Sequence, residues 1–317
     1  MKIAIRLLRN RNFILLLAVA LGLAAGQLAH WTQPAVLPVL ALVMTLSTAS
    51  ITTHELASLR SMTRPVLTSL VLNYVVCAAV ILVTARLLID DSELWAGFVV
   101  LAAVPTAVAV TPFSYILGGN VFYSLIGMVS IYISALIITP LIIVAFLGAG
   151  FIEPMKLVMI LVQLIVIPLI ASRLLRLTGL IHSINKWRGT TVNWSFFLVV
   201  FTIVGLNREV FFEEIDVVVK ISIIAIAFAF ILGHIIEFVA SRMHLDRETT
   251  ISWMMLGTKK NNALASAIAL SLFGERASIP ATVSVVFAIL HVVWLGYYLK
   301  RRRPKTTTPG QPESRQQ

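Results

Sequence analysis

Two lysines interrupt an otherwise apolar stretch near the C-terminal end of the chain. Residues 257–262 read Gly-Thr-Lys-Lys-Asn-Asn inside the apolar run 249–273. A charged side chain at membrane depth is costly to bury, and it normally faces the protein interior or an aqueous cavity. There, an ammonium group can attract an anion or stand in the place of a bound cation. The candidate binding residues of this segment are Lys259, Lys260, Asn261 and Asn262.

A second interruption lies in the apolar run 94–117. Pro105 and Pro112 each lack a backbone N–H, so they disrupt the hydrogen bonds of a helix that contains them. Carbonyl groups freed in this way at membrane depth must face protein or water. The candidate binding residues at this interruption are Thr106, Thr111 and Ser114.

The composition indicates a membrane environment for most of the chain. Of its 317 residues, 59% are apolar and 12% are charged, and the mean hydropathy is +0.94. A soluble domain is about 45–50% apolar and about 25% charged, so ordinary soluble, disordered and coiled-coil proteins are excluded. The single cysteine, Cys77, excludes an internal disulfide framework. At roughly 20 residues per span, the length predicts an all-α polytopic membrane protein with about ten transmembrane helices.

The basic residues between the apolar stretches predict the orientation. Most of them lie before the first span, in the loops after spans two, six and eight, and after the last span. The positive-inside rule then places both termini in the cytoplasm, and we expect the plasma (inner) membrane. The net charge of +11 is therefore explained by basic residues that mark the membrane topology and contact anionic lipid. We do not expect nucleic-acid binding. The predicted spans are about 12–30, 34–52, 65–89, 94–117, 121–149, 155–175, 190–207, 216–239, 249–273 and 279–299.

The two interruptions occupy matching places, because each lies in the fourth span of a set of five. Five is odd, so the second set would cross the membrane in the opposite direction to the first. Paired broken helices in such repeats mark the binding site of many secondary transporters. We therefore expect two inverted five-helix repeats with crossing broken helices in spans 4 and 9. The expected divisions are a cytoplasmic N-terminus (1–11), the first repeat (12–150), the second repeat (151–300) and a disordered basic cytoplasmic tail (301–317).

Further motifs accompany the interruptions. They are the proline-led broken helix at Pro105, Tyr115, Gly119-Asn120, Ser124 and Thr139-Pro140, followed in span nine by Asn261, Ala263, Leu264, Ala265 and Phe273. In this combination the chain resembles the bile acid/sodium symporter family (BASS, SBF-like) over most of its length. The resemblance implies a core of spans 3–5 and 8–10 beside a panel of spans 1, 2, 6 and 7. It also implies organic-anion substrates between core and panel, such as bile acids, sulfated steroids or pyruvate, and two sodium ions behind the crossing.

The chain departs from the sodium ligands of that family. A Ser-Asn pair of the family falls at Val110-Thr111, and its bridging glutamate falls at Leu256. Ser124 is retained, but Met128 replaces a threonine one turn later. Hard cations require oxygen ligands, and the side chains of valine, leucine and methionine supply none. We therefore expect neither a cofactor nor the family's two-sodium site.

Two hypotheses account for the lysines. The glutamine that ligates the second sodium in the family falls at Lys260, and the glutamine of span three falls at Asn73. In the first hypothesis, the Lys260 ammonium is a tethered substitute for that ion, bonded by Asn73, by carbonyls near Thr111 and by Asn261. In the second, Lys259 or Lys260 faces an aqueous cavity and attracts an anionic substrate. A lysine can also release a proton, so coupling to protons, or no coupling, stays open.

The expected function is secondary transport of a small or amphipathic organic anion by alternating access, by a monomer or weak homo-oligomer in the lipid bilayer. One alternative is an arsenite-type efflux carrier of related fold, although such carriers place a cysteine in the first broken helix. Another is a non-transporting membrane receptor or scaffold that has lost its ion sites. The sequence contains no metalloprotease, phosphate-loop or nucleophile-elbow motif, so we do not expect an enzyme.

Overall fold

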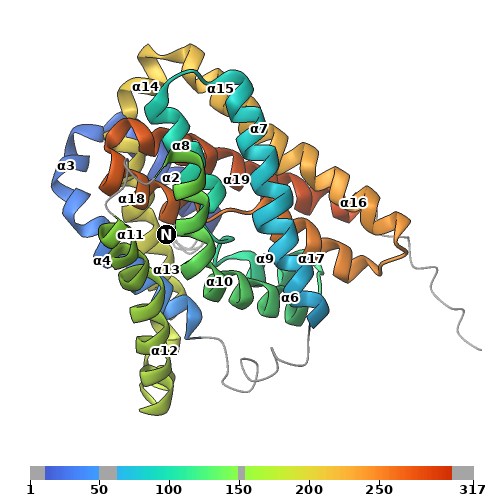
Figure 1. The fold of residues 1–317 in the computed structure, drawn as a ribbon. Coiled ribbons are helices and arrows are strands. Elements are labelled where there is room, and N and C mark those ends of the chain that lie inside the picture. The colour runs from blue at the N-terminus through green and yellow to red at the C-terminus, as the bar shows by residue number, and fades with distance from the viewer. Residues whose placement is uncertain (1–10, 50–62, 149–153, 302–317) are drawn as a thin grey trace, which may run out of the picture.

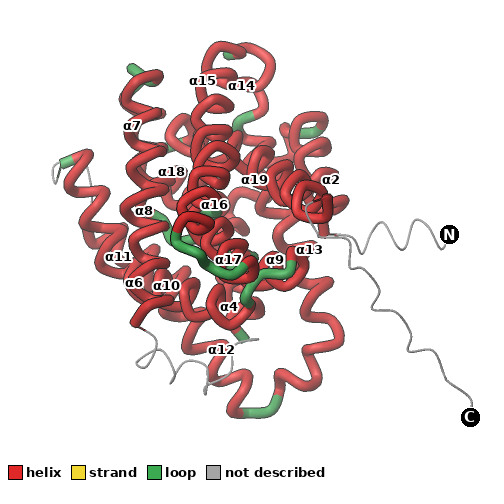
Figure 2. Tube along the Cα trace, turned by 90° about the vertical axis from the view of Figure 1, so that its right-hand side faces the viewer, coloured by secondary structure: helices red, strands yellow, loops and turns green. Residues whose placement is uncertain are grey.

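The described part of the chain is built from helices. The computed structural model describes residues 11–49, 63–148 and 154–301, and these residues form no β-sheet. Figure 2 shows helices joined by short loops throughout. The predicted class, an all-α polytopic membrane protein, is confirmed, since seven of the described helices are long and apolar enough to cross a membrane. The terminal segments 1–10 and 302–317, which include most of the expected N-terminal and tail regions, lie outside the described residues.

The helices are labelled in Figure 1, where α14 and α15 lie at one end of the molecule and α12 extends at the other. Three pairs, α6 with α7, α11 with α12 and α15 with α16, are joined through the π-helical stretches Val71–Cys77 (η4), Val162–Val166 (η6) and Ala227–Ile231 (η7). Short 3₁₀ turns, Gly26–Leu28 (η1) and Gln33–Ala35 (η2), flank α3. The α-helices are α2 (Arg11–Ala24), α3 (Ala29–Thr32), α4 (Val36–Thr48), α6 (Thr63–Leu70), α7 (Ala78–Leu88), α8 (Ser92–Ala103), α9 (Val110–Leu117), α10 (Val121–Leu147), α11 (Pro154–Leu161), α12 (Ile167–Leu177), α13 (Leu180–Leu206), α14 (Arg208–Glu213), α15 (Ile215–Ile226), α16 (Leu232–Arg242), α17 (Arg247–Thr258), α18 (Asn262–Phe273) and α19 (Glu275–Arg301).

The seven long helices correspond to seven of the ten predicted spans, and the other three differ for physical reasons. The first predicted span contains α2, and after its last residue, Ala24, the chain passes into the 3₁₀ turn η1. The fourth predicted span is divided into α8 and α9, and the ninth is divided into α17 and α18. Both divided spans carry the residues expected to interrupt a helix.

The fourth span unwinds between α8 and α9. Val104 has an extended backbone (φ −69°, ψ 155°), and Pro105 cannot donate a helical hydrogen bond. The chain becomes helical again at Val110. Pro112 therefore does not extend the interruption, which corrects the expectation that both prolines break the helix. It lies in the first turn of α9, where the backbone N–H groups have no partner within the helix in any case.

The ninth span unwinds around the two lysines, from Lys259 to Asn261. Gly257 is still helical, and α16 packs closely against it, since a Cβ at Gly257 would lie 2.5 Å from Cδ1 of Ile236. Asn261 caps the start of α18, the second half of this span, because its side-chain oxygen accepts the backbone N–H of Leu264 at 3.1 Å. This is the usual role of asparagine before the first turn of a helix.

The helices form two groups that meet along one boundary. In the first group, α2, α4, α12 and α13 pack mainly on one another. In the second, α8, α10, α18 and α19 pack together, with α6, α7 and α9 and the α15–α17 region around them. The first group corresponds to the expected panel and the second to the expected core. The two unwound segments belong to the second group.

An ionic cluster ties the starts of three helices together at the end where α14 and α15 lie. The Nε atom of Arg276 donates to Asp91 at 2.7 Å, and its two terminal nitrogens donate to both carboxylate oxygens of Glu214 at 2.9 and 3.0 Å. Asp91 also caps α8 by accepting the backbone N–H groups of Glu93 and Leu94. The cluster fixes α8 and α19 beside the turn that begins α15.

At the opposite end of the second group, Asp246 caps α17 and sets a pH-dependent contribution to stability. The backbone N–H and the hydroxyl of Thr249 both donate to its carboxylate at 2.7 Å, and chiefly these bonds hold the pKa of Asp246 below its ordinary value. The folded protein therefore binds the proton less readily than the unfolded chain. The stabilisation is fully present above the unfolded pKa of about 3.9 and is lost as the pH falls through the lower folded pKa.

We expect Asp246→Ala to lower the free energy of unfolding by about 1 kcal/mol at neutral pH. Thermal unfolding in detergent from neutral to acidic pH measures this, and the difference from wild type should shrink below about pH 4. Asp246→Asn is the matched control, because asparagine also caps helices. A full difference that persists in acid would contradict the assignment.

Candidate functional site

The two unwound segments lie side by side in antiparallel direction and hold each other through their backbones. Thr106 pairs with Lys260 in this arrangement. The N–H of Asn261 donates to the carbonyl of Pro105 at 2.9 Å, and the hydroxyl of Thr106 donates to the carbonyl of Lys259 at 2.6 Å. Backbone groups that both helices leave unpaired are thus satisfied by the other segment, as burial at membrane depth requires.

Lys260 points into a cage of oxygen atoms formed by the second group of helices. Its ammonium nitrogen lies 3.0 Å from the backbone oxygen and 2.9 Å from the side-chain oxygen of Asn73. It also lies 2.8 Å from the carbonyl oxygen of Ala102 and 3.1 Å from that of Val104. The ring of Tyr74 covers it with its centroid 5.2 Å away. Because an ammonium has three N–H bonds, two of these four oxygens must share one hydrogen.

The cage exists because the surrounding helices are irregular at this depth. Ala102 and Val104 lie where α8 ends, and the residues four positions later, Thr106 and Val108, are not helical, so their N–H groups do not occupy these carbonyls. Asn73 lies in the π-helical stretch η4, a local irregularity that occurs frequently at functional sites. Lys260 itself is only 3% exposed.

Lys259 has a different environment on the other side of the break. Its ammonium nitrogen lies 2.6 Å from Nδ1 of His291 and 3.3 Å from the carbonyl oxygen of Ala288, both on α19. The Nε2 atom of His291 is buried and has no hydrogen-bond partner among the described residues.

The predicted asparagines have separate roles. The side-chain nitrogen of Asn261 donates to the hydroxyl of Tyr132 at 2.9 Å, a partner the sequence did not indicate, so Asn261 does not bond Lys260 with its side chain. Asn262 follows in the first turn of α18, and its side-chain oxygen is buried without a partner. It lines the same cavity as the two lysines.

Thr106 bonds the backbone of Lys259, whereas the other hydroxyl residues near the first break bond one another or a neighbouring side chain. Ser114 and Ser124 form a mutual hydrogen bond of 2.7 Å, and Thr111 donates to the sulfur of Met128 at 3.7 Å. The expectation that carbonyls near Thr111 would surround Lys260 is wrong. The carbonyls come from the other side of the break, where α8 ends.

Three cavities open where the two groups of helices meet. One of about 100 Å³ reaches Lys259, Lys260, Asn261 and Asn262 and is closed from the first group by Phe196 and Val200, among other apolar residues. The next, of about 410 Å³, contains the polar residues Thr111, Arg188 and Asn193. Val108 and Ala109 line both, so the unwound segment forms their shared wall.

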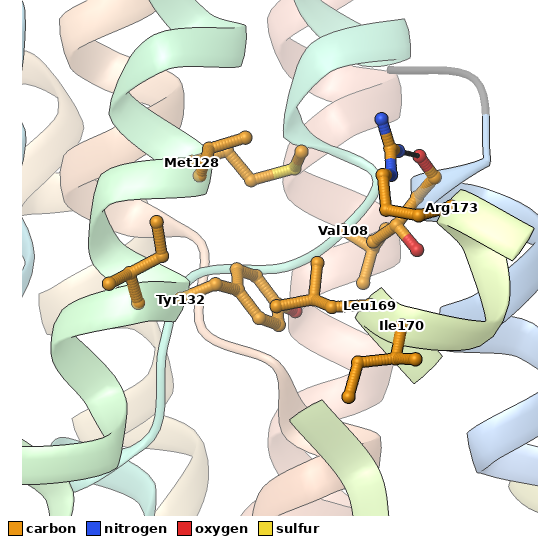
Figure 3. A pocket seen from close by; sticks show the side chains of 9 residues that line it. Val108, Met128, Tyr132, Leu169, Ile170 and Arg173 are labelled. Carbon is orange, nitrogen blue, oxygen red and sulfur yellow. Dashed lines mark hydrogen bonds between the residues drawn. The ribbon is translucent and has the colours of Figure 1, made fainter. Parts of the chain in front are cut away.

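The third cavity, of about 230 Å³, is almost wholly apolar. Figure 3 shows Met128 and Tyr132 of α10 facing Leu169 and Arg173 of α12, with Val108 of the unwound segment beside them. The guanidinium of Arg173 donates to the carbonyl of Thr48 at the end of α4 at 2.8 Å. The boundary thus offers apolar volume with a basic group at its edge.

Within the described ranges, no acidic side chain forms an ion pair with Lys259 or Lys260. The same ranges contain no cluster of histidine, cysteine, aspartate or glutamate able to hold a metal ion. Two basic side chains therefore lie beside apolar and basic cavities at this boundary.

The fold and this arrangement define a class of protein. An all-helical membrane protein with two broken helices that meet at their unwound segments has the architecture of a secondary transporter. The profile of the SBF-like CPA transporter family matches residues 12–300 of the chain. The chain therefore belongs to this transporter family, and the resemblance drawn from the sequence is confirmed. No curated protein matches the chain closely in sequence.

Proposed function

We propose that the protein is a secondary transporter of a small or amphipathic organic anion and that it works by alternating access. In this proposal, spans one to five and six to ten are inverted repeats, and the two groups of helices rock against each other around the paired breaks. Both termini are cytoplasmic in the plasma (inner) membrane, as the distribution of basic residues favours. The unit is a monomer or a weak homo-oligomer.

The observation that carries this proposal is the uncompensated positive charge beside cavities at the boundary between the groups. Lys259 and Lys260 line one cavity and Arg188 lines the next, with apolar residues over most of both surfaces. A carboxylate or sulfate would meet the charge, and an apolar body would fit the remaining surface. Because these cavities lie at the boundary between the two groups, a rocking motion would change access to them.

We further propose that Lys260 takes the place of a transported cation. Its four oxygen neighbours are of the kind that bind hard metal cations. The positions of the family's other sodium ligands do not fit sodium, because Val110 and Leu256 are fully buried hydrocarbon side chains and Met128 offers a thioether. Sodium therefore has no part in the transport cycle that we propose.

The alternatives are less well supported. An arsenite carrier would need an accessible thiol, but Cys77 is buried within η4 and is absent from the residues lining the cavities described above. A receptor or scaffold would have no need of paired unwound segments, whose backbone groups are costly to satisfy in a membrane. Membership of a transporter family also supports transport over catalysis.

Uptake into proteoliposomes tests the proposal, with labelled pyruvate, taurocholate and arsenite as probes. We expect saturable uptake of an organic anion, and we expect Lys259→Gln to reduce it at least about tenfold, since it removes a buried charge at the anion site. Lys156→Gln, which removes an exposed lysine of α11, is the matched control and should transport normally. Uptake of arsenite alone, or no uptake and no thermal stabilisation by any anion, would contradict the proposal.

A further inference from the structure

Lys259 and His291 form a buried pair of nitrogen bases that the anion site alone does not explain. The two nitrogens are 2.6 Å apart, and Lys259 is 2% exposed while His291 is fully buried. An ammonium group can only donate hydrogen bonds, so in this pair Nδ1 of His291 must accept. The neutral imidazole then carries its hydrogen on Nε2, which is the atom without a partner.

A small space lies between Nε2 of His291 and helix α16. Gly233 of α16 lies there, and a Cβ built on it would be 3.5 Å from Nε2 of His291. Any larger side chain at this position would close the space. The absence of a side chain therefore keeps one face of Nε2 open toward α16.

A second set of ionisable groups lies beyond this opening. Trp294 lies against both histidines, with ring centroids 6.0 Å from His291 and 5.0 Å from His234. Nδ1 of His234 is 3.2 Å from the carboxylate of Glu237, which also accepts the hydroxyl of Tyr298 at 3.0 Å. The side chain of His234 is 41% exposed, so this set reaches the surface.

Other ionisable groups lie on the elements that pack around the pair. Lys260 follows in the same break, and Cys77 of η4 is buried nearby. Helix α18 and the stretch η7 contain none. The ionisable groups on the other elements include Tyr74 on η4, Glu93 on α8, Tyr115 on α9, Tyr123 and Tyr132 on α10, His182, Lys186 and Arg188 on α13, Asp216 and Lys220 on α15, Arg242 on α16, Arg247 and Glu248 on α17, and Glu275, Arg276, Tyr297, Lys300 and Arg301 towards the ends of α19.

We propose that Lys259 and His291 are a proton-binding site that couples anion transport to the movement of one proton. On release, an Nζ–H bond of Lys259 breaks as an Nδ1–H bond of His291 forms. The Nε2–H bond then breaks, and its proton leaves to water in the space beside Gly233 and onward to His234 and Glu237. The products are a neutral amine and a neutral imidazole whose Nδ1–H now donates to Nζ, so the hydrogen bond reverses and the pair changes from +1 to 0. Uptake is the reverse.

The effect of this proton on anion binding rests on the function proposed above. The protonated pair carries the charge that holds a monoanion in the cavity, and the neutral pair does not. By linkage, anion affinity should fall by up to about tenfold per pH unit once the pair loses its proton. One proton would then accompany each monoanion across the membrane, and the cycle would be electroneutral.

The first test does not need a substrate. In protein labelled with ¹⁵N-histidine, the His291 signals are assigned by their loss in His291→Gln, and spectra are recorded from about pH 5 to about pH 9. We expect the two ring nitrogens to exchange roles, with Nδ1 unprotonated at low pH and protonated at high pH. An Nδ1 atom that stays unprotonated, or a ring that does not respond to pH, would overturn the proposal.

The second test follows proton entry with a pH-sensitive dye trapped in proteoliposomes as an anion is taken up. Gly233→Ala should slow proton-coupled uptake at least about tenfold, because a methyl group fills the space beside Nε2 at ordinary contact distance. Gly296→Ala, also on a helix, with its nearest neighbour 3.6 Å away, should match wild type. Anion uptake without protons would overturn the proton site and leave the transporter intact. If no anion enters at all, the transport proposal fails, and the ¹⁵N spectra alone decide whether the pair exchanges a proton.

Discussion

Replacing Lys260 by methionine is expected to lower the free energy of unfolding by about 3–5 kcal/mol, because it leaves buried acceptors without their donor. Methionine nearly matches the length of the lysine side chain, so the loss comes from the ammonium and not from a cavity. The oxygens left unpaired would be those of Asn73, Ala102 and Val104. Thermal unfolding of the purified protein in detergent measures the effect.

Two further variants make this result specific. Lys156→Met changes an exposed lysine and should leave the unfolding midpoint within a degree or so of wild type. Lys260→Arg retains the charge but brings a larger, planar group into a cage of four oxygens, so it should also destabilise. If Lys260→Met unfolds at the wild-type temperature, the ammonium does not hold the cage together.

Gly97→Ala is expected to have a second large effect, because it forces α8 and α19 apart. A Cβ at Gly97 would overlap the carbonyl oxygen of Ala277 and lie 2.9 Å from Cγ of Pro280. No rotamer change can relieve an overlap with backbone, so we expect a loss of about 3 kcal/mol. Since α8 also presents the carbonyls that surround Lys260, transport should fall with stability.

Thermal unfolding and uptake measured on the same preparation test this prediction. Gly296→Ala is the control on α19, because alanine is accommodated there, and it should be neutral or slightly stabilising, as is usual within a helix. Normal stability of Gly97→Ala would mean that α8 and α19 approach less closely than the structure has them.

The positions of the two breaks could be predicted from the sequence because their causes are local. Pro105 removes a backbone donor wherever it lies, and two adjacent lysines are incompatible with a lipid-facing helix. The extent of each break was less predictable. Pro112 belongs to the first turn of α9, since a proline disrupts a helix only when its N–H would have had a partner.

The contacts of the site depend on how distant segments pack, and the sequence indicates few of them. Asn73 was suggested as a neighbour of Lys260 through the family resemblance, and the structure brings the two together. The carbonyls of Ala102 and Val104 have no signature in the residue types, because every residue carries a carbonyl. His291 lies 32 residues beyond Lys259, and a single histidine in an apolar helix gives no indication of its partner.

If the Lys260 ammonium is the resident cation of the site, sodium should not stabilise the wild-type protein. The most direct measurement is the unfolding temperature of the wild-type protein in sodium chloride and in potassium chloride at equal ionic strength, beside the double variant Lys260→Gln with Leu256→Glu. A ligand that binds only the folded state raises this temperature by mass action. We expect equal unfolding temperatures for the wild type in the two salts and a higher temperature in sodium for the double variant, which regains a carboxylate and an open cage. Stabilisation of the wild type by sodium over potassium would contradict it.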